Sequence, residues 1–204
     1  MNSPLIQRKR KTADPCQTCF LHKDRCICAG IPTLKLRTKI TLVIHAKELK
    51  RTTNTGRLAL KALPNSEMRI RGEGKDALDL SDLLTPDYRT FLFYPSDDAV
   101  ELDQKLVNES PLPIQLIVPD GNWRQASKVH YRHHELKDIL RVKISSPNPA
   151  TTHLRAETTE AGMATLEAIA TALGIIEGKD VGDVMMKLFQ DKLQATLKGR
   201  GKII

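Results

Sequence analysis

The four cysteines constrain the fold of this chain more than any other feature, because all of them lie in one short window. They follow the pattern C-x₂-C-x₆-C-x-C at Cys16, Cys19, Cys26 and Cys28, and the rest of the 204-residue sequence contains none. Two closely spaced thiolate pairs can surround one metal ion tetrahedrally, and soft sulfur ligands select zinc or iron–sulfur over hard cations. We predict a closed, structural zinc knuckle over residues 15–31, because the window is compact and nothing else indicates electron transfer.

Disulfides and free buried thiols are the alternatives for these cysteines. Disulfides conflict with the intracellular location inferred below, and unrelated cysteines would not cluster so tightly. His22 lies inside the window and could replace one cysteine as a ligand, although a solvated loop histidine is the simpler interpretation.

The basic surplus of the chain favours an acidic partner. Lys and Arg number 32 against 24 Asp and Glu, which gives a formal net charge of +8. Such a surplus is typical of nucleic-acid-binding proteins, although many basic proteins bind no nucleic acid. Aromatic residues make up only 4% of the chain, which argues against a sheet that stacks bases.

The N-terminal residues 1–14 are predicted to form a flexible basic arm, with its cations between Arg8 and Lys11. An apolar run of roughly 7–15 residues, which a secretory signal requires, does not follow them. Nor does any stretch approach the ~18 apolar residues of a membrane helix. We therefore expect a cytoplasmic protein without membrane contact, and nothing in the sequence implies an obligate protein partner.

Residues 32–204 are predicted to form one α/β domain with a largely parallel sheet and helices on both faces. Continuously apolar runs of strand length alternate with helical patterns, as buried parallel strands require. The expected strands are 39–45, 90–94, 114–118 and 139–144, with a weaker one at 68–71, and the expected helices are 47–63, 98–108, 122–137, 158–173 and 181–198. In such sheets ligands bind beyond the carboxyl ends of the strands.

The segment from Asp120 to Trp123 follows one of these strands and leads into a helix. One interpretation is an ordinary Pro-Asp-Gly turn with Asn122 as the helix N-cap. The other is a carboxylate held at the mouth of the sheet, beside the only tryptophan of the chain, where it can accept a proton or hold a ligand. The residues alone do not decide between the two.

Two further strand ends carry polar residues. His45 and Glu48 are three residues apart, so they would share one face of a helix, either as a metal or acid–base pair or as a structural hydrogen-bonded pair. Asn54 and Thr55 form a polar patch that could face a ligand.

A basic stripe is predicted on the helix that begins near Trp123. Arg124, Lys128 and Arg132 recur every four residues, which suits either a solvated face or contact with phosphates. The last helix and the tail add cations that could extend this surface, namely Lys187, Lys192, Lys198, Arg200 and Lys202.

These elements, in this order, resemble the DTW-domain family from Cys16 to about Leu197. The likeness rests on the cysteine pattern and on short motifs that keep their order and spacing. They are His45-x-x-Glu48, Asn54-Thr55, Tyr94-Pro95, Asp120-x-x-Trp123, Leu154-Arg155-x-Glu157 and Thr165-Leu166-Glu167-Ala168. The chain departs from the family signature Asp-x-Thr-Trp at Asn122. Because asparagine also caps helices, this change threatens a role for the threonine hydroxyl rather than the fold.

The resemblance implies a fold similar to the SPOUT methyltransferases, with a trefoil knot. The bacterial members that the chain looks like are tRNA-uridine aminocarboxypropyltransferases. They transfer the 3-amino-3-carboxypropyl group of S-adenosylmethionine to N3 of a uridine in the tRNA variable loop and release methylthioadenosine. The alternatives are a SPOUT-like RNA methyltransferase, a non-catalytic zinc-containing RNA-binding module, and the same transfer onto ribosomal RNA.

The resemblance also suggests roles for particular residues. Asp120, beside Trp123, would take the N3 proton or orient N3. Arg155 and Glu157, with Leu154, would hold the methionine moiety of the cofactor. The remaining expected contacts are to adenosine, from Tyr94, Pro95, Ser96, Val118, Pro119 and Gly121, and to RNA, from His45, Glu48, Asn54, Thr55, Arg124, Lys128 and Arg132.

Overall fold

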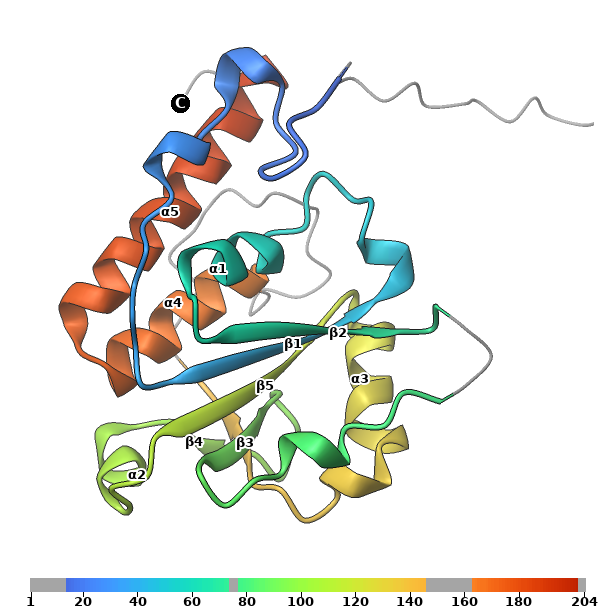
Figure 1. Ribbon diagram of the computed structural model, residues 1–204, viewed down its shortest axis with the longest axis vertical. Coiled ribbons are helices and arrows are strands. Elements are labelled where there is room, and N and C mark those ends of the chain that lie inside the picture. Colours follow the sequence, from blue (N-terminus) through green and yellow to red (C-terminus); the bar gives the residue numbers. More distant parts are fainter. Residues whose placement is uncertain (1–13, 74–76, 146–162, 202–204) are drawn as a thin grey trace, which may run out of the picture.

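The computed structural model describes residues 14–73, 77–145 and 163–201 (Figure 1). Its centre is a sheet of parallel strands, β1 (Lys39–His45), β2 (Ser66–Arg71), β3 (Arg89–Phe93), β4 (Val100–Glu101), β5 (Ile114–Asp120) and β6 (Arg141–Lys143). Within the described residues the order is β2-β1-β5-β3-β6-β4, and every pairing is parallel. The predicted α/β fold with a largely parallel sheet is confirmed.

Helices cover both faces of this sheet, as predicted. The α-helices are α1 (Gly56–Ala62), α2 (Gln104–Asn108), α3 (Trp123–Arg132), α4 (Thr165–Ile176) and α5 (Lys179–Lys198). Five short 3₁₀ helices join them within the described ranges: η1 (Lys23–Arg25), η2 (Cys28–Gly30), η3 (Ala46–Glu48), η4 (Ser81–Leu83) and η5 (His134–Leu136).

The two faces of the sheet bury two separate apolar clusters, because successive side chains of a strand point to opposite sides. In β5, Leu116 and Val118 pack with α1, α4 and α5, whereas Ile117 packs with Val129 of α3 on the other face. A strand buried on both sides must be apolar throughout, which explains the unbroken apolar runs of the sequence.

All five predicted helices have somewhat different bounds in the structure. The helix expected at 122–137 is α3, which ends at Arg132 and is followed by η5, and the helix expected at 181–198 is α5, which begins two residues earlier. The helix expected at 47–63 is confined to α1, preceded by η3 and a connection that ends at Thr55. Asn54 and Thr55 direct their side chains into tertiary hydrogen bonds, and these contacts override helix propensity. The helix expected at 98–108 begins only at Gln104, because Asp103 caps it and residues 100–101 form β4. The helix expected at 158–173 is α4, and residues 158–162 lie outside the described residues.

α4 and α5 form a close helical pair over one face of the sheet (Figure 1). Their backbones approach at Gly174 and Gly182, where a Cβ atom on Gly182 would stand 2.7 Å from the Cα of Gly174. No side chain fits there, so glycine sets the distance between the two helices.

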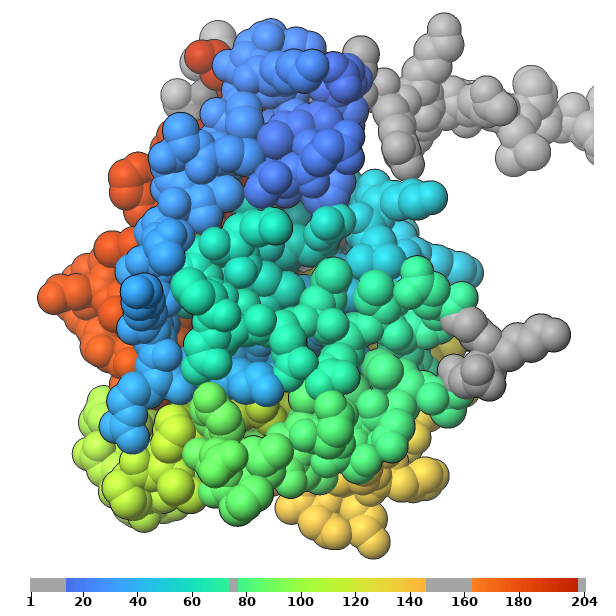
Figure 2. Space-filling model, in the orientation of Figure 1, coloured from blue at the N-terminus to red at the C-terminus, as the bar shows by residue number. Residues whose placement is uncertain are grey.

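The cysteine-containing segment packs against the C-terminal half of α5 (Figures 1 and 2). Cys19 and Leu21 are buried in the same apolar cluster as α1, α4 and α5, with Ile27 and Ile31 packed at its edge. The predicted basic arm lies outside the described residues except for Asp14. Among the helices of the described ranges, none is both long and apolar enough to cross a membrane.

Candidate functional site

Asp120 stands at the carboxyl end of β5 and is the centre of a buried polar network. Only 4% of the residue is exposed. Its Oδ2 accepts a hydrogen bond from Asn54 Nδ2, and its Oδ1 accepts one from Thr165 Oγ1 at 2.5 Å. Hydrogen bonds on both oxygens stabilise and orient an ionised carboxylate.

The same network joins the start of α4 to the connection that precedes α1. Thr55 Oγ1 accepts the backbone N–H of Leu166 at 3.2 Å, and Glu167 accepts the backbone N–H of Ala164 at 3.1 Å. Thr55 and Glu167 are both buried. Three motifs more than forty residues apart in the sequence, around 54–55, 120 and 165–168, therefore meet at one point.

Asn122 caps α3, as the simpler of the two sequence interpretations proposed. Its Oδ1 accepts the N–H of Gln125 at 2.9 Å, and Gln125 Oε1 accepts the N–H of Asn122 at 2.8 Å, which completes a capping box. Gly121 leaves room for this arrangement, because a Cβ there would stand 2.8 Å from Gln125 Cβ.

Trp123 lies on the surface rather than in the core. It is 42% exposed, and its ring meets the edge of Tyr94 at a centroid distance of 6.5 Å. Tyr94 also stacks on His130 of α3 at 5.3 Å. Burial raises the pKa of Tyr94, so its hydroxyl remains protonated at neutral pH.

The residues expected to cradle adenosine come from the ends of two paired strands. Tyr94, Pro95 and Ser96 follow β3, and Val118 and Pro119 belong to β5, which pairs with β3. Parallel strands bring their carboxyl ends to one edge of a sheet, so these segments lie at the edge where α/β domains bind ligands. The expected methionine contacts Leu154, Arg155 and Glu157 lie outside the described residues.

His45 and Glu48 flank η3, with different surroundings. His45 Nδ1 accepts the backbone N–H of Lys47 at 3.1 Å and caps this turn. Glu48 is fully buried and lies 3.1 Å from Arg51 Nε. Burial lowers the pKa of His45, and the charges of Arg71 and Lys47 lower it further. Glu48, Asn54 and Thr55 are buried, as Asp120 is, and their expected contact with RNA stays a prediction.

The predicted basic stripe on α3 is joined by cations from the ends of β1 and β2. The pKa of Lys128 is lowered, first by the charge of Arg132 and then by slight desolvation and the charges of Arg124, Arg71 and Lys47. The charges of Arg132, Arg124, Arg71 and Lys47 thus act on Lys128, and we call these five residues the positive surface of α3.

The four cysteines converge as a tetrahedral metal site requires. Their sulfur atoms all lie within 4.8 Å of one another, with Cys16 and Cys28 at 3.5 Å and Cys19 and Cys26 at 3.7 Å, and all four are free thiols. Backbone N–H groups of Cys19 and Thr18 lower the pKa of Cys16 to about 6, whereas burial raises the pKa of Cys19 and of Cys28. The donor set fits a thiolate-bound metal ion and excludes the disulfide alternative in this structure.

Lys192 lies in the interior of the protein rather than on its basic surface. The prediction that Lys192 extends the basic surface is wrong, because this residue of α5 is completely buried. Its Nζ donates hydrogen bonds to the backbone oxygens of Cys19 at 2.5 Å and Thr52 at 3.2 Å. Burial lowers its pKa to about 8 against the opposing effect of the cysteines. Its position on the apolar face of α5 was the only available signal.

The fold and the site together define a class of protein, an α/β domain with a buried carboxylate at the carboxyl edge of its sheet and a cluster of four cysteines that could hold a metal ion. The family model of the DTW domain matches residues 13–197, and the chain belongs to the DTW-domain family.

Curated relatives support the family assignment. The chain is 24% identical to tRNA-uridine aminocarboxypropyltransferase 2 of Macaca fascicularis over 179 residues, which are 85% of this chain and 59% of the relative. It is 25% identical to the Mus musculus protein of that name over 79% of the chain and 56% of the relative. It is 28% identical to the Drosophila melanogaster protein of that name, over 82% of the chain and 71% of the relative.

The chain spans less than two thirds of the length of the two mammalian relatives. These three relatives are animal proteins, so the likeness to bacterial members stays a prediction. No solved structure matches the chain significantly.

Proposed function

We propose that this protein is a tRNA-uridine aminocarboxypropyltransferase, which moves the 3-amino-3-carboxypropyl group of S-adenosylmethionine to N3 of a uridine in the tRNA variable loop. The observation that carries the proposal is the meeting of three separate motif segments on Asp120, in a chain of the DTW-domain family. The names of the three relatives support the same reaction.

Asp120 accepts the proton of uridine N3 or holds N3–H in line with the electrophile. In the reaction N3 loses its proton and forms a bond to the terminal carbon of the aminocarboxypropyl group. The bond from that carbon to sulfur breaks, and its electron pair leaves with neutral methylthioadenosine. Asn54 and Thr165 fix the carboxylate, so the main contribution of these residues is orientation. Trp123, exposed next to Tyr94, offers an apolar surface beside the reacting base.

The cofactor binds at the carboxyl edge of β3 and β5 in this proposal. The adenosine moiety contacts the segments 94–96 and 118–121, and Leu154, Arg155 and Glu157 hold the methionine moiety. The SPOUT-like knot is proposed from the family resemblance alone.

The tRNA binds across the positive surface of α3. Arg124, Lys128 and Arg132, together with Lys47 and Arg71, neutralise backbone phosphates, which is how most proteins gain affinity for RNA. A cytoplasmic location follows from this substrate. The cysteine site holds zinc in a closed, structural role, because all four ligand positions are filled by thiolates.

The test is incubation of purified protein with total tRNA and labelled S-adenosylmethionine, followed by mass spectrometry of nucleosides. We expect a uridine carrying the aminocarboxypropyl group, and methylthioadenosine as the second product. S-adenosylhomocysteine in its place would identify a methyltransferase, and the absence of cofactor binding in a calorimetric titration would identify a non-catalytic RNA-binding module.

Asp120→Ala tests the role of the carboxylate. We expect transfer to fall by at least a hundred-fold while S-adenosylmethionine still binds. Asp82→Ala serves as the matched control, because Asp82 is an exposed carboxylate on η4, on the other face of the sheet from α1 and α4. Near-normal turnover of the Asp120 variant would refute the assignment.

A further inference from the structure

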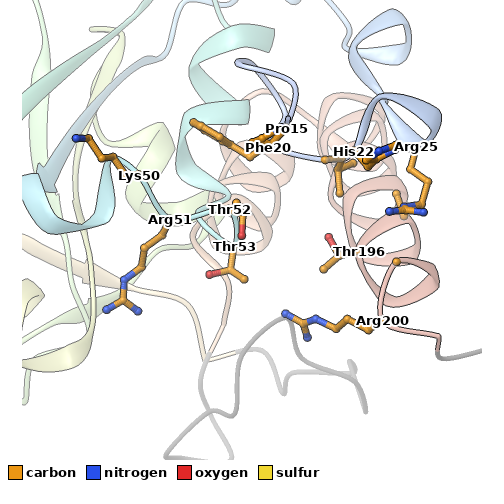
Figure 3. Close-up of a pocket in the computed structure, with 13 residues that line it drawn as sticks. Pro15, Phe20, His22, Arg25, Lys50, Arg51, Thr52, Thr53, Thr196 and Arg200 are labelled. Carbon is orange, nitrogen blue, oxygen red and sulfur yellow. The ribbon is translucent and has the colours of Figure 1, made fainter. Parts of the chain in front are cut away.

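A basic cavity of about 720 Å³ lies between the cysteine knuckle, the connection before α1 and the C-terminal end of α5 (Figure 3). Its walls carry four permanent cations, Arg25 from the knuckle, Lys50 and Arg51 from the connection, and Arg200 after α5. Asp and Glu are missing from its described lining. We call this space the knuckle cavity.

We infer that the knuckle cavity is a second tRNA-binding site, which holds the phosphate backbone of the substrate beside the zinc knuckle. This inference rests on the proposed function, since it supplies a surface for the same substrate. Arg51 pairs with the buried Glu48, so Arg25, Lys50 and Arg200 carry the excess positive charge of this concavity. Such an excess focuses a positive potential, and a polyanion is the ligand that it attracts most strongly.

The polar and aromatic lining suits nucleotides as well. Thr52, Thr53 and Thr196 place hydroxyl groups along the walls, and that of Thr196 donates to the backbone oxygen of Lys192 at 2.8 Å. Threonine hydroxyls commonly hydrogen-bond phosphate and ribose groups. Phe20 also lines the cavity, and Arg57 of α1 lies over its ring at 4.8 Å. The volume lies within the range of about 300–1,000 Å³ that small-molecule pockets show, so one or two nucleotide units fit.

The position of the cavity relative to Asp120 supports an RNA path rather than an isolated anion site. Lys47 lies in η3, and the connection from η3 to α1 carries Lys50 and Arg51 in the cavity wall and Asn54 near its end. Lys47 belongs to the positive surface of α3, and Asn54 binds Asp120. One stretch of chain therefore links both positive surfaces to the proposed catalytic carboxylate.

The knuckle shapes this cavity through direct contacts. The Arg25 side chain lies against the end of α5, where a Cβ on Gly199 would stand 3.1 Å from Arg25 Nε. Lys192 joins the backbone of Cys19 in the knuckle to Thr52 in the opposite wall. The distance between the two walls thus depends on a folded knuckle.

The test compares tRNA binding by the charge reversals Arg25→Glu and Lys50→Glu with that of wild type. Lys105→Glu is the matched control, because it changes the net charge equally on α2, at the opposite end of the molecule from the knuckle (Figure 1). Dissociation constants for total tRNA are measured by filter binding between 50 and 300 mM salt, with circular dichroism to confirm folding. The two cavity residues come from different walls, so Lys50→Glu still tests the site if the knuckle misfolds in Arg25→Glu.

We expect each cavity variant to weaken binding about ten-fold at low salt and to reduce the slope of log K against log salt by about 1, with no change in the control. Equal affinities and slopes in wild type and cavity variants would overturn the inference, and so would an equal loss in Lys105→Glu. Loss of S-adenosylmethionine binding without loss of tRNA binding would overturn it as well, because the cavity would then hold the cofactor. Transfer activity of the wild type is measured separately, so failure of the proposed function leaves this result interpretable.

Discussion

Removal of the Thr165 hydroxyl should measure how much the buried network contributes. Thr165→Val keeps the shape of the side chain, including the Cγ2 methyl group that lies near Gly56, and deletes only the donor to Asp120 Oδ1. A hydrogen bond to a charged group is worth about 1.5–3 kcal/mol, whereas one between neutral groups is worth about 1 kcal/mol. Asp120 is only 4% exposed, and the new methyl group of valine occupies the position from which a water molecule could replace the lost hydroxyl. Most of the free energy of this hydrogen bond should therefore be lost.

We therefore expect Thr165→Val to lower the free energy of unfolding by about 2 kcal/mol, or the melting temperature by roughly 4–8 °C for a chain of this length. Urea unfolding followed by circular dichroism gives the first quantity. Transfer to tRNA should fall by about ten- to a hundred-fold, because a carboxylate with one partner fewer is oriented less precisely.

Thr171→Val is the matched control on the same helix. The Thr171 hydroxyl donates to the backbone oxygen of Glu167, one helical turn earlier, at 3.1 Å. The acceptor in this hydrogen bond is an uncharged carbonyl group rather than a carboxylate. We expect a change within about 0.5 kcal/mol and normal transfer. Equal stability losses in the two variants, or normal transfer by Thr165→Val, would refute the view that Asp120 depends on Thr165.

Three further predictions concern the metal, the helical pair and the cap. Purified protein should contain one zinc per chain by atomic emission spectroscopy. Cys26→Ser or a strong chelator should lower both the metal content and the melting temperature. Iron together with visible absorbance would contradict the assignment of zinc. Gly182→Ala should cost about 1–3 kcal/mol in urea unfolding, because the new Cβ meets backbone at 2.7 Å, whereas Gly30→Ala, with nothing within 4 Å, should be neutral. Asn122→Thr should keep the unfolding free energy within about 0.5 kcal/mol, because both residues cap helices, and a larger loss would mean that Asn122 does more than cap α3.

Much of the fold could be predicted from the sequence, because buried parallel strands leave an unmistakable pattern. The run Lys39–His45 is a strand with the predicted bounds, and the runs at 90–94 and 114–118 differ from β3 and β5 by one or two residues. The pattern contains no information on strand order, so the place of β5 between β1 and β3 had to come from the structure. The helix predicted over 47–55 is absent for a related reason. The hydrogen-bond partners of Asn54 and Thr55 lie on β5 and α4, far away in the sequence.

The candidate site was predictable in its residue types and only partly in its geometry. Asp120 stands out in the sequence because it ends a strand, and the cysteines stand out by their spacing. In the structure Asp120 joins a hydrogen-bonded network, and the four cysteines lie together. The partner role of Thr165 depends on a contact across 45 residues, for which the sequence carries no local signal. The resemblance to the DTW-domain family suggested that Asn54 and Thr55 contact RNA, and the structure adds that they hydrogen-bond Asp120 and the start of α4.

Lys192 shows how the knuckle and the proposed catalytic site depend on each other. Burial of an ammonium group costs several kcal/mol, and a leucine in its place would pack on α5 without that cost. What leucine cannot do is bond the Cys19 and Thr52 carbonyls together. Thr52 lies two residues before Asn54, which holds Asp120, so the cysteine knuckle supports the carboxylate through one lysine. The knuckle is therefore part of the architecture of the site, although its closed sulfur shell leaves it no direct chemical role.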